Sequence, residues 1–526
     1  MEILTYLGAV RKFRRFFIVC AKGLAILAAL LLLLILAAAC FVGWLKWSAD
    51  RDWKRVQVEL KAKGEKLSFA EFIPLAPPDK ENFFADPIWR ELSDLVPTTH
   101  KENGCEYQTW APRLPSEKQQ INEWMTPLSA SEKEQVEKLL PKASFQEMDK
   151  KTRLAAINQL RSVLQKTTDP ERRKQIAALQ LTLLQPAEPL LAKITELSLR
   201  PQAFFPTRWQ DGVTTPLPHL TSLLMLSQLF WARGLTEMES DNSLAAFSDA
   251  LTILRLSTFG KNEPILISYL VRCSILQQGL SVINSGIEQH KWNDVELTEF
   301  QKKLEGMNCV KDFCFSLRGE RAFVNSVVYP NYLSQMPHEE GWMGFYDRSM
   351  VMFMLEYTRP LNSVLIQRII ETLEQNTDKG INASTPLFDQ ELKHLKADPI
   401  KSRLDAIEMV ALPVFDMSVQ KAIEVQTVLN QTLIACVLER YHLAHGSYPA
   451  SLDALVPEYL SVIPKKPTTG GAMHYRLLDG ERGERFLLWA PGWKLQTLGG
   501  KSGEFSGEGD IVWNLRLPSE RRKTTP

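Results

Sequence analysis

The sequence predicts a mainly α protein with one N-terminal transmembrane helix, an irregular antiparallel helical-hairpin domain and a small C-terminal α+β domain. Three observations predict it. Residues 23–45 carry no charge, residues 217–330 form amphipathic helix patterns joined by short polar turns, and Gly, Pro, aromatic and β-branched residues dominate after Gly446. The expected segments are a cytoplasmic basic tail at 1–22, the transmembrane helix at 23–45, an irregular connector at 46–115, the helical domain at 116–411, the α+β domain at 412–515 and a disordered tail at 516–526.

The bulk composition is that of an ordinary globular protein without a dominant charge. The chain has 526 residues, of which 45% are hydrophobic and 23% charged, and 62 Lys and Arg are balanced by 61 Asp and Glu. This length allows about three domains of about 150 residues each. Because the balanced charges create no global field that would steer a polyanion, we expect no nucleic-acid partner.

The apolar run near the amino terminus predicts a membrane anchor. Its core from Leu24 to Phe41 is almost unbroken aliphatic sequence. The uncharged run is 23 residues long, which at about 1.5 Å per residue covers about 34 Å, enough for a hydrocarbon core of about 30 Å. Trp44 and Trp47 follow, and indole rings favour the membrane interface. The lipid bilayer is therefore an expected partner.

The flanking charges predict the orientation of this anchor. Five cations precede the run and four follow it, namely Arg11, Lys12, Arg14, Arg15 and Lys22 before it and Lys46, Arg51, Lys54 and Arg55 after it. Cations beside a span tend to stay in the cytoplasm, and the short tail would otherwise carry its charges across. We expect a single-pass inner-membrane protein with a cytoplasmic amino terminus and an extracytoplasmic, periplasmic main domain.

Two other interpretations of the apolar run stay open. A signal peptide could be cleaved after Ala37-Ala38-Ala39, or a lipoprotein signal could end at Cys40. Both need polar sequence soon after the cleavage site, whereas residues 41–45 stay apolar. This flank favours an uncleaved signal-anchor.

Prolines and glycines indicate where the connector lies and where the first helices end. Residues 46–64 have the pattern of a helix that leaves the membrane and ends at Gly64. Residues 65–115 are interrupted by several prolines, among them Pro74, Pro77, Pro78, Pro87 and Pro97, which predicts irregular structure there. Residues 116–200 are expected to be helical.

Residues 217–330 have the strongest helical pattern. The expected helices cover about 219–240, 243–259, 263–289 and a fourth that starts at Asn293 or Asp294. Their short polar turns predict antiparallel neighbours. The aromatic and Pro positions of a tetratricopeptide repeat do not line up, so irregular hairpins are favoured over a repeat array.

Helices and then strands are expected in the last part of the chain. Helix patterns cover 342–376 and 386–411, and a long helix runs from about Asp416 to His445. The expected strands lie near 473–478, 485–490 and 510–515.

A distinctive run follows the long helix. Residues 441–449 read YHLAHGSYP, residues 451–460 read SLDALVPEYL, and Ile463-Pro464-Lys465 and Pro467 come next. This order resembles the post-helix segment of the major pseudopilins of type II secretion systems. There a helix ends in a Tyr-Pro turn and leads to an Ile-Pro stretch and a three-stranded sheet. The resemblance covers about residues 420–515 and implies a pseudopilin-like α+β domain.

The chain also departs from that family. Gly8-Ala9-Val10-Arg11 is no prepilin peptidase site, and about 370 residues separate the anchor from the segment, so assembly into a pilus is not implied. Some pseudopilins bind calcium in their last loop. Here Glu504, Glu508 and Asp510 offer oxygens, which is few for a calcium site.

The middle of the chain resembles, more faintly, the helical domains of uncharacterised membrane-anchored bacterial envelope proteins that end in the same segment. The residues that carry this likeness are Ser243–Phe259, Glu263–Ser268 and Gly319-Glu320-Arg321-Ala322. That resemblance implies an architecture and no activity.

A metal site on the long helix stays open. Glu439, His442 and His445 follow one another at a spacing of three, so they could project from adjacent turns and, with one more ligand, hold a metal ion. The alternative is a solvated helix end, where His interacts favourably with the helix dipole.

Other chemistry has weaker support. Glu320 with Asp312 could act as an acid pair, or both could lie on an ordinary solvated helix face. Cys309 and Cys314 could pair after export, or stay free, buried thiols. The sequence has no GxSxG, GxGxxG or HExxH motif. We therefore assign no catalytic or cofactor-binding residue and expect no cofactor.

These patterns together predict a membrane-anchored extracytoplasmic scaffold or protein-interaction component of a bacterial envelope, with other envelope proteins as partners. Two alternatives remain. One is a membrane-anchored hydrolase, and the other is an accessory protein of a secretion or pilus-like system. Whether the protein is an enzyme stays open, with a non-enzymatic role favoured.

Overall fold

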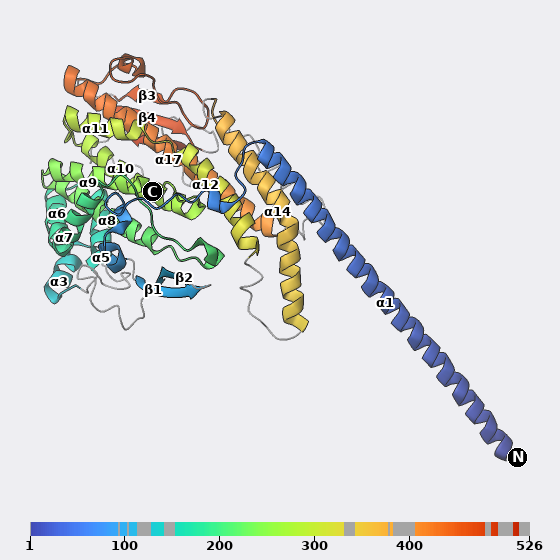
Figure 1. Cartoon of the computed structure of the whole chain (residues 1–526). Helices are drawn as coiled ribbons and strands as arrows, with labels where there is room; N and C mark the ends of the chain where they lie inside the picture. Colours follow the sequence, from blue (N-terminus) through green and yellow to red (C-terminus); the bar gives the residue numbers. More distant parts are fainter. Residues whose placement is uncertain are drawn as a thin grey trace.

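The computed structural model shows a mainly helical body with a small sheet and one long helix that extends away from it (Figure 1). The described residues are 2–92, 95–102, 105–112, 128–140, 153–330, 342–376, 379–381, 406–478, 485–492 and 509–514. The coarse prediction of a mainly α fold with a small antiparallel sheet is confirmed.

The long helix that leaves the body is α1, Glu2–Ala62. The apolar run and the helix expected at 46–64 are therefore one continuous element. The helix is followed by Gly64, whose φ of +75° lies in the left-handed region that commonly closes helices. Its last turns lie beside the body, and its amino-terminal end lies far from it (Figure 1).

The connector after α1 contains the short helix that Asp86-Pro87-Ile88-Trp89 predicts, and it also contains a hairpin that was not expected. It comprises the 3₁₀ helices η1, Phe69–Glu71, and η2, Phe83–Ala85, the helix α2, Ile88–Leu92, and the strands β1, Leu95–Glu102, and β2, Cys105–Pro112. The two strands form an antiparallel hairpin. The expectation of an irregular connector is wrong here. A two-stranded ribbon has only edge strands, so it tolerates Pro97, and Asn103-Gly104 in the sequence is a hairpin turn signal.

The body consists of helices that pack both on neighbours in sequence and on elements that are distant in sequence. The elements are α3 Ala130–Leu139, α5 Arg153–Lys166, α6 Pro170–Leu184, η5 Gln185–Ala187, α7 Glu188–Leu197, η6 Trp209–Thr214, α8 Pro218–Glu239, α9 Ser243–Thr258, α10 Leu266–Glu288, α11 Asp294–Glu305, α12 Cys309–Phe323, the π-helix η7 Val324–Val328 and α14 Trp342–Asn376. Helix α9 packs against both α8 and α10, as the short turns predict.

The predicted helix boundaries in this region are confirmed closely. Asn293 caps α11 by accepting from the Glu296 amide at 3.0 Å, and the Glu296 carboxylate accepts from the Asn293 amide at 3.0 Å. This reciprocal arrangement is the capping box. Helix α9 is followed by Gly260 at a φ of +74°, as expected for a helix stop.

The last part of the chain has one long helix and a three-stranded sheet. Helix α17 spans Ala406–His445 and begins about ten residues earlier than expected. It is followed by η8, Leu452–Leu455, and by the strands β3, His474–Leu477, β4, Phe486–Pro491, and β5, Asp510–Asn514, in the antiparallel order β3-β4-β5. All three strands lie where the sequence predicts them. Most of the helix expected at 386–411 lies outside the described residues.

The helical body and the sheet share one hydrophobic core. The same cluster of buried side chains contains Leu229 of α8, Ile283 of α10, Val437 of α17 and Phe486 of β4. Helix α17 is the element that joins them, since it packs against α10 and α11 and also against β4 and β5. The helical and α+β segments of the chain are therefore packed as one unit.

One described helix is long and apolar enough to cross a membrane. It is α10, Leu266–Glu288, and most of it is buried within the body. Packing in the core explains its composition, because a helix that is apolar on nearly all sides is buried either in a protein or in a bilayer.

Candidate metal site on the long helix

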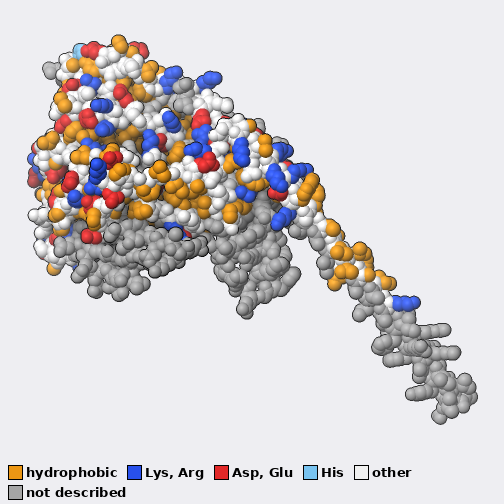
Figure 2. All heavy atoms as spheres, viewed as in Figure 1, with side chains coloured by type: hydrophobic (Ala, Val, Ile, Leu, Met, Phe, Trp, Pro, Cys, Tyr) orange, Lys and Arg blue, Asp and Glu red, His pale blue; other side chains and the backbone are white. Residues whose placement is uncertain are grey.

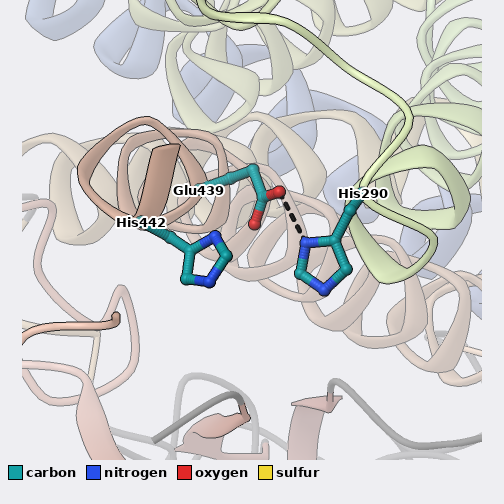
Figure 3. A group of neighbouring side chains, drawn as sticks. All are labelled: His290, Glu439 and His442. Carbon is teal, nitrogen blue, oxygen red and sulfur yellow. Dashed lines mark hydrogen bonds and ion pairs between the residues drawn. The ribbon is translucent and has the colours of Figure 1, made fainter. Parts of the chain in front are cut away.

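Two facing segments form a cluster of metal-binding side chains (Figure 3). Glu439 and His442 lie one turn apart near the end of α17, and His290 comes from the turn between α10 and α11. One donor atom from each of the three residues lies within 4.8 Å of the donors of the other two.

The turn that carries His290 is fixed by an unusual packing contact. A Cβ atom added at Gly286 would lie 2.1 Å from the Trp292 ring, so only glycine permits this approach. The Trp292 indole donates to the Ile283 carbonyl at 2.8 Å. His290 lies between Gly286 and Trp292 in the chain. Its φ of +52° is uncommon for a residue with a Cβ. Such local strain is often found at functional sites.

Glu439 is the centre of the cluster. Its side chain is fully buried. One carboxylate oxygen lies 2.8 Å from Nδ1 of His290, and the other accepts from the Tyr448 hydroxyl at 2.6 Å. A buried carboxylate needs such partners, because removing it from water is otherwise very costly. Burial and the neighbouring Glu439 carboxylate both raise the pKa of Tyr448, so this tyrosine remains a hydroxyl donor at neutral pH.

His442 completes the cluster. Its ring stacks on Tyr448, with 4.7 Å between centroids, and lies 5.3 Å from the ring of His290. Its Nδ1 atom is buried and has no hydrogen-bond partner among the described residues. Figure 3 shows the two imidazoles on either side of the Glu439 carboxylate. Two imidazoles and one carboxylate are a ligand set used for zinc and other divalent transition metals.

The sequence predicts part of this cluster. Glu439 and His442 do lie together, but His445 does not join them. It is exposed, stacks on Tyr441 at 4.0 Å between centroids, and directs its Nδ1 to the Tyr441 carbonyl at 2.9 Å. At about 100° per residue, a step of six rotates His445 about 120° away from Glu439. The third member, His290, lies 149 residues before Glu439 in the chain, and no local pattern links the two.

The proposed acid pair of Glu320 and Asp312 has a structural explanation instead. Asp312 accepts from Arg272 at 2.7 Å. Glu320 accepts the Leu266 amide at 3.0 Å, and so binds one of the free amides at the start of α10. Burial raises the pKa of Glu320. Because each carboxylate has its own partner, the structure does not support an acid pair.

The described cysteines are free thiols. Cys309 and Cys314, which could have formed a disulfide, are both buried in α12 and unpaired, as are Cys273 and Cys436. Burial raises the pKa of Cys314 to about 12 and that of Cys273 to about 11, so neither is a thiolate at neutral pH. The free-thiol interpretation is therefore confirmed for these four residues.

The carboxylates considered for calcium are described only in part. Asp510 is buried at the start of β5, while Glu504 and Glu508 lie outside the described residues.

A cavity of about 360 Å³ lies between α8 and α10. Glu239, on its wall, is bound by the Arg173 guanidinium and accepts from Gln289 at 3.1 Å. Since this carboxylate is engaged in an ion pair, it is poorly placed to act as a general base.

Comparisons with protein-family models, with curated proteins and with solved structures returned no match.

Proposed function

We propose that the protein is a membrane-anchored, extracytoplasmic scaffold of a bacterial envelope, held in the bilayer by α1. The observation that carries this proposal is the surface of α1. Its described leucines between Lys22 and Lys46 stand exposed, for example Leu27 at 68% and Leu34 at 70%. Figure 2 shows hydrophobic side chains along the part of α1 that leaves the body. A solitary helix with such a surface is stable in hydrocarbon and would aggregate in water.

The same helix connects the membrane to the body without a flexible linker. Trp47 is still exposed, whereas Ala49, Trp53 and Val56 are already buried. Trp53, Val56 and Leu60 form a small cluster with Val364 of α14, and the Arg359 guanidinium lies 4.1 Å from the centre of the Trp53 ring. The body therefore begins within about one helical turn of the aromatic residues expected at the membrane surface.

A buried ion-pair network secures this junction. Glu65 follows α1 and accepts from Arg321 at 2.6 Å and from Arg318 at 3.0 Å. Arg318 also donates to Glu374 of α14 at 2.7 Å. Burial would raise the pKa of Glu65, but the two arginines outweigh it and hold the pKa below its ordinary value. A body fixed in this way presents its surface at a constant distance from the membrane, which suits a scaffold.

The two alternatives have less support. A hydrolase needs a carboxylate or imidazole that is free to act on a substrate. In the 360 Å³ cavity, Glu239 is already paired with Arg173, and Glu288, which also lines the cavity, has a partner as well. An accessory role in secretion rests on the likeness of residues 420–515 to pseudopilins. The order of a long helix, a short turn and a three-stranded sheet agrees with that likeness, but such an arrangement alone does not define a function.

Crosslinking in intact cells, with recovery through a carboxy-terminal affinity tag and mass spectrometry, tests the scaffold proposal. We expect the same envelope proteins to be recovered from the parent chain and from a variant in which residues 23–45 are replaced by an unrelated transmembrane helix. That variant keeps the body at the membrane, so it separates binding by the body from contacts of the span. Recovery of the chain alone, or turnover of a defined substrate that a point variant abolishes, would contradict the proposal.

A further inference from the structure

We propose that His290, Glu439 and His442 bind one divalent transition-metal ion of the zinc class. This site goes beyond the scaffold role and does not depend on it.

The donor atoms are of the right kind and nearly at the right separation. Four-coordinate zinc binds His nitrogens and carboxylate oxygens at about 2.0–2.2 Å, which places neighbouring donors about 3.3 Å apart. Here His290 Nδ1 and Glu439 lie 2.8 Å apart, and all three donors lie within 4.8 Å. Side-chain shifts of about 1 Å around an entering ion would therefore complete three ligand bonds.

His442 provides the second, independent observation. Its buried Nδ1 has no hydrogen-bond partner among the described residues, although most buried polar atoms in proteins have one. Figure 3 shows this ring beside the Glu439 carboxylate. A metal ion between the two imidazoles would give this nitrogen a ligand bond. The ion would also replace the present hydrogen bond between His290 and Glu439.

The residues around the cluster support a metal site. Tyr448 binds the second carboxylate oxygen of Glu439 at 2.6 Å, which orients the carboxylate as outer-shell partners of metal ligands do. The nearby cations are engaged elsewhere: Arg440 donates to Asp294 at 2.8 Å, and Lys291 pairs with Asp241. They therefore need not compete with the ion for Glu439.

The site is open on one side. The His290 side chain is 44% exposed, while that of Glu439 is fully buried, so an ion would enter past His290 and bind at the edge of the core. Three protein ligands leave a fourth position for water or for a group of a partner protein. Such an ion would also join the α10–α11 turn to the carboxy-terminal end of α17.

Zinc titration of the full-length protein in detergent micelles tests this proposal. The protein carries a tag without histidine, is stripped with EDTA, and competes with a chromophoric chelator for ZnCl₂. We expect one equivalent of zinc to bind to the parent chain. His290→Ala and His442→Ala should each lower the affinity at least about tenfold, as loss of a metal-site residue does.

His445→Ala is the matched control, because it removes an exposed histidine from the same helix end. It should bind zinc as the parent does, within about twofold, since it makes none of the three ligand bonds. His290 is partly exposed, so its variant is expected to fold, which circular dichroism verifies. Absence of zinc binding to the parent, or equal affinity of the parent and both ligand variants, would overturn the proposal.

Discussion

Glu65 shows how much a single side chain contributes where α1 meets the body. Its carboxylate binds two guanidinium groups, and Arg321 is only 1% exposed. Without Glu65, the bond to the Gln367 side-chain oxygen would be the one hydrogen bond left to the Arg321 side chain among the described residues. Removal of one partner from a buried ion pair leaves an uncompensated charge, which costs far more than the pair itself contributes.

Glu65→Ala should therefore destabilise the protein by about 3–5 kcal/mol. Glu374→Ala is the control, because that carboxylate also binds Arg318 but is 46% exposed, so its loss should cost about 1 kcal/mol or less. Urea unfolding of the full chain in micelles, followed by circular dichroism, measures both. Equal losses of unfolding free energy in the two variants would show that the buried carboxylate of Glu65 contributes no more than the exposed one of Glu374.

The lowered pKa of Glu65 predicts that the stability of the protein depends on pH. The folded-state pKa of Glu65 lies below its ordinary value of 4.5. Its contribution to stability is therefore fully present at neutral pH and is lost as the pH falls below about 4.5 through the folded-state pKa. The difference in melting temperature between the parent and Glu65→Gln should shrink between pH 7 and pH 3.5. Other carboxylates titrate in both proteins, so their effects cancel in the difference between the two melting temperatures. A difference that stays constant with pH would contradict the assigned role of Glu65.

At the residue scale, sequence spacing predicts only contacts within one helix. The three-residue step from Glu439 to His442 is such a contact, and it is confirmed. The contacts of Glu439 with His290 and of Glu65 with Arg321 join residues 149 and 256 positions apart. No local periodicity encodes these pairs, because they depend on how the helices pack.

Among the elements, the end of α14 illustrates a contact that only glycine allows. Gly380 and Gly470 have φ values of +91° and +67° and bring two backbone segments together. A Cβ at Gly380 would lie 2.1 Å from the Thr469 carbonyl carbon. The Ile381 amide donates to the Pro467 carbonyl at 2.7 Å and closes the contact. This contact fixes the loop before β3 against the helical body.

Gly380→Ala should destabilise the protein through both backbone strain and this clash. Gly446→Ala is the matched control, because Gly446 has a φ of +75° but nothing near its missing Cβ. The control should cost about 1–2 kcal/mol from strain alone. Gly380→Ala should cost about 1–3 kcal/mol more from overpacking. Thermal unfolding measures the stability of both variants. Similar losses of stability would show that the loop before β3 moves away from the added methyl group at no cost in free energy.

Helix limits follow from the sequence where capping residues are strong. Asn293 and Gly260 mark boundaries that the structure confirms. The β1–β2 hairpin was missed because the prolines in residues 65–115 suggested irregular structure, although Asn103-Gly104 is a turn signal that could have revealed it. The early start of α17 was missed as well, because Pro413 suggested a helix boundary where the helix continues.

For the whole molecule, the proposed function divides α1 into two parts with different roles. We propose that residues 23–45 lie in the membrane, while Trp53, Val56 and Leu60 pack in the body. Removal of residues 1–45 should release a folded protein into the soluble fraction. Removal of residues 1–62 should instead expose the face of α14 that these three side chains cover and lower the melting temperature. Fractionation and thermal unfolding measure both, and a membrane-bound 46–526 fragment would contradict the division.

Cysteine labelling in cells measures which side of the inner membrane the body occupies. Val462→Cys places a thiol at an exposed position of the body, 69% accessible, and Thr5→Cys places one in the amino-terminal tail. A maleimide that cannot cross the inner membrane is added to cells with a permeabilised outer membrane. With the body in the periplasm, we expect labelling of Val462→Cys in intact cells and of Thr5→Cys only after lysis. Labelling of Thr5→Cys before lysis, or protection of Val462→Cys, would contradict this placement of the body.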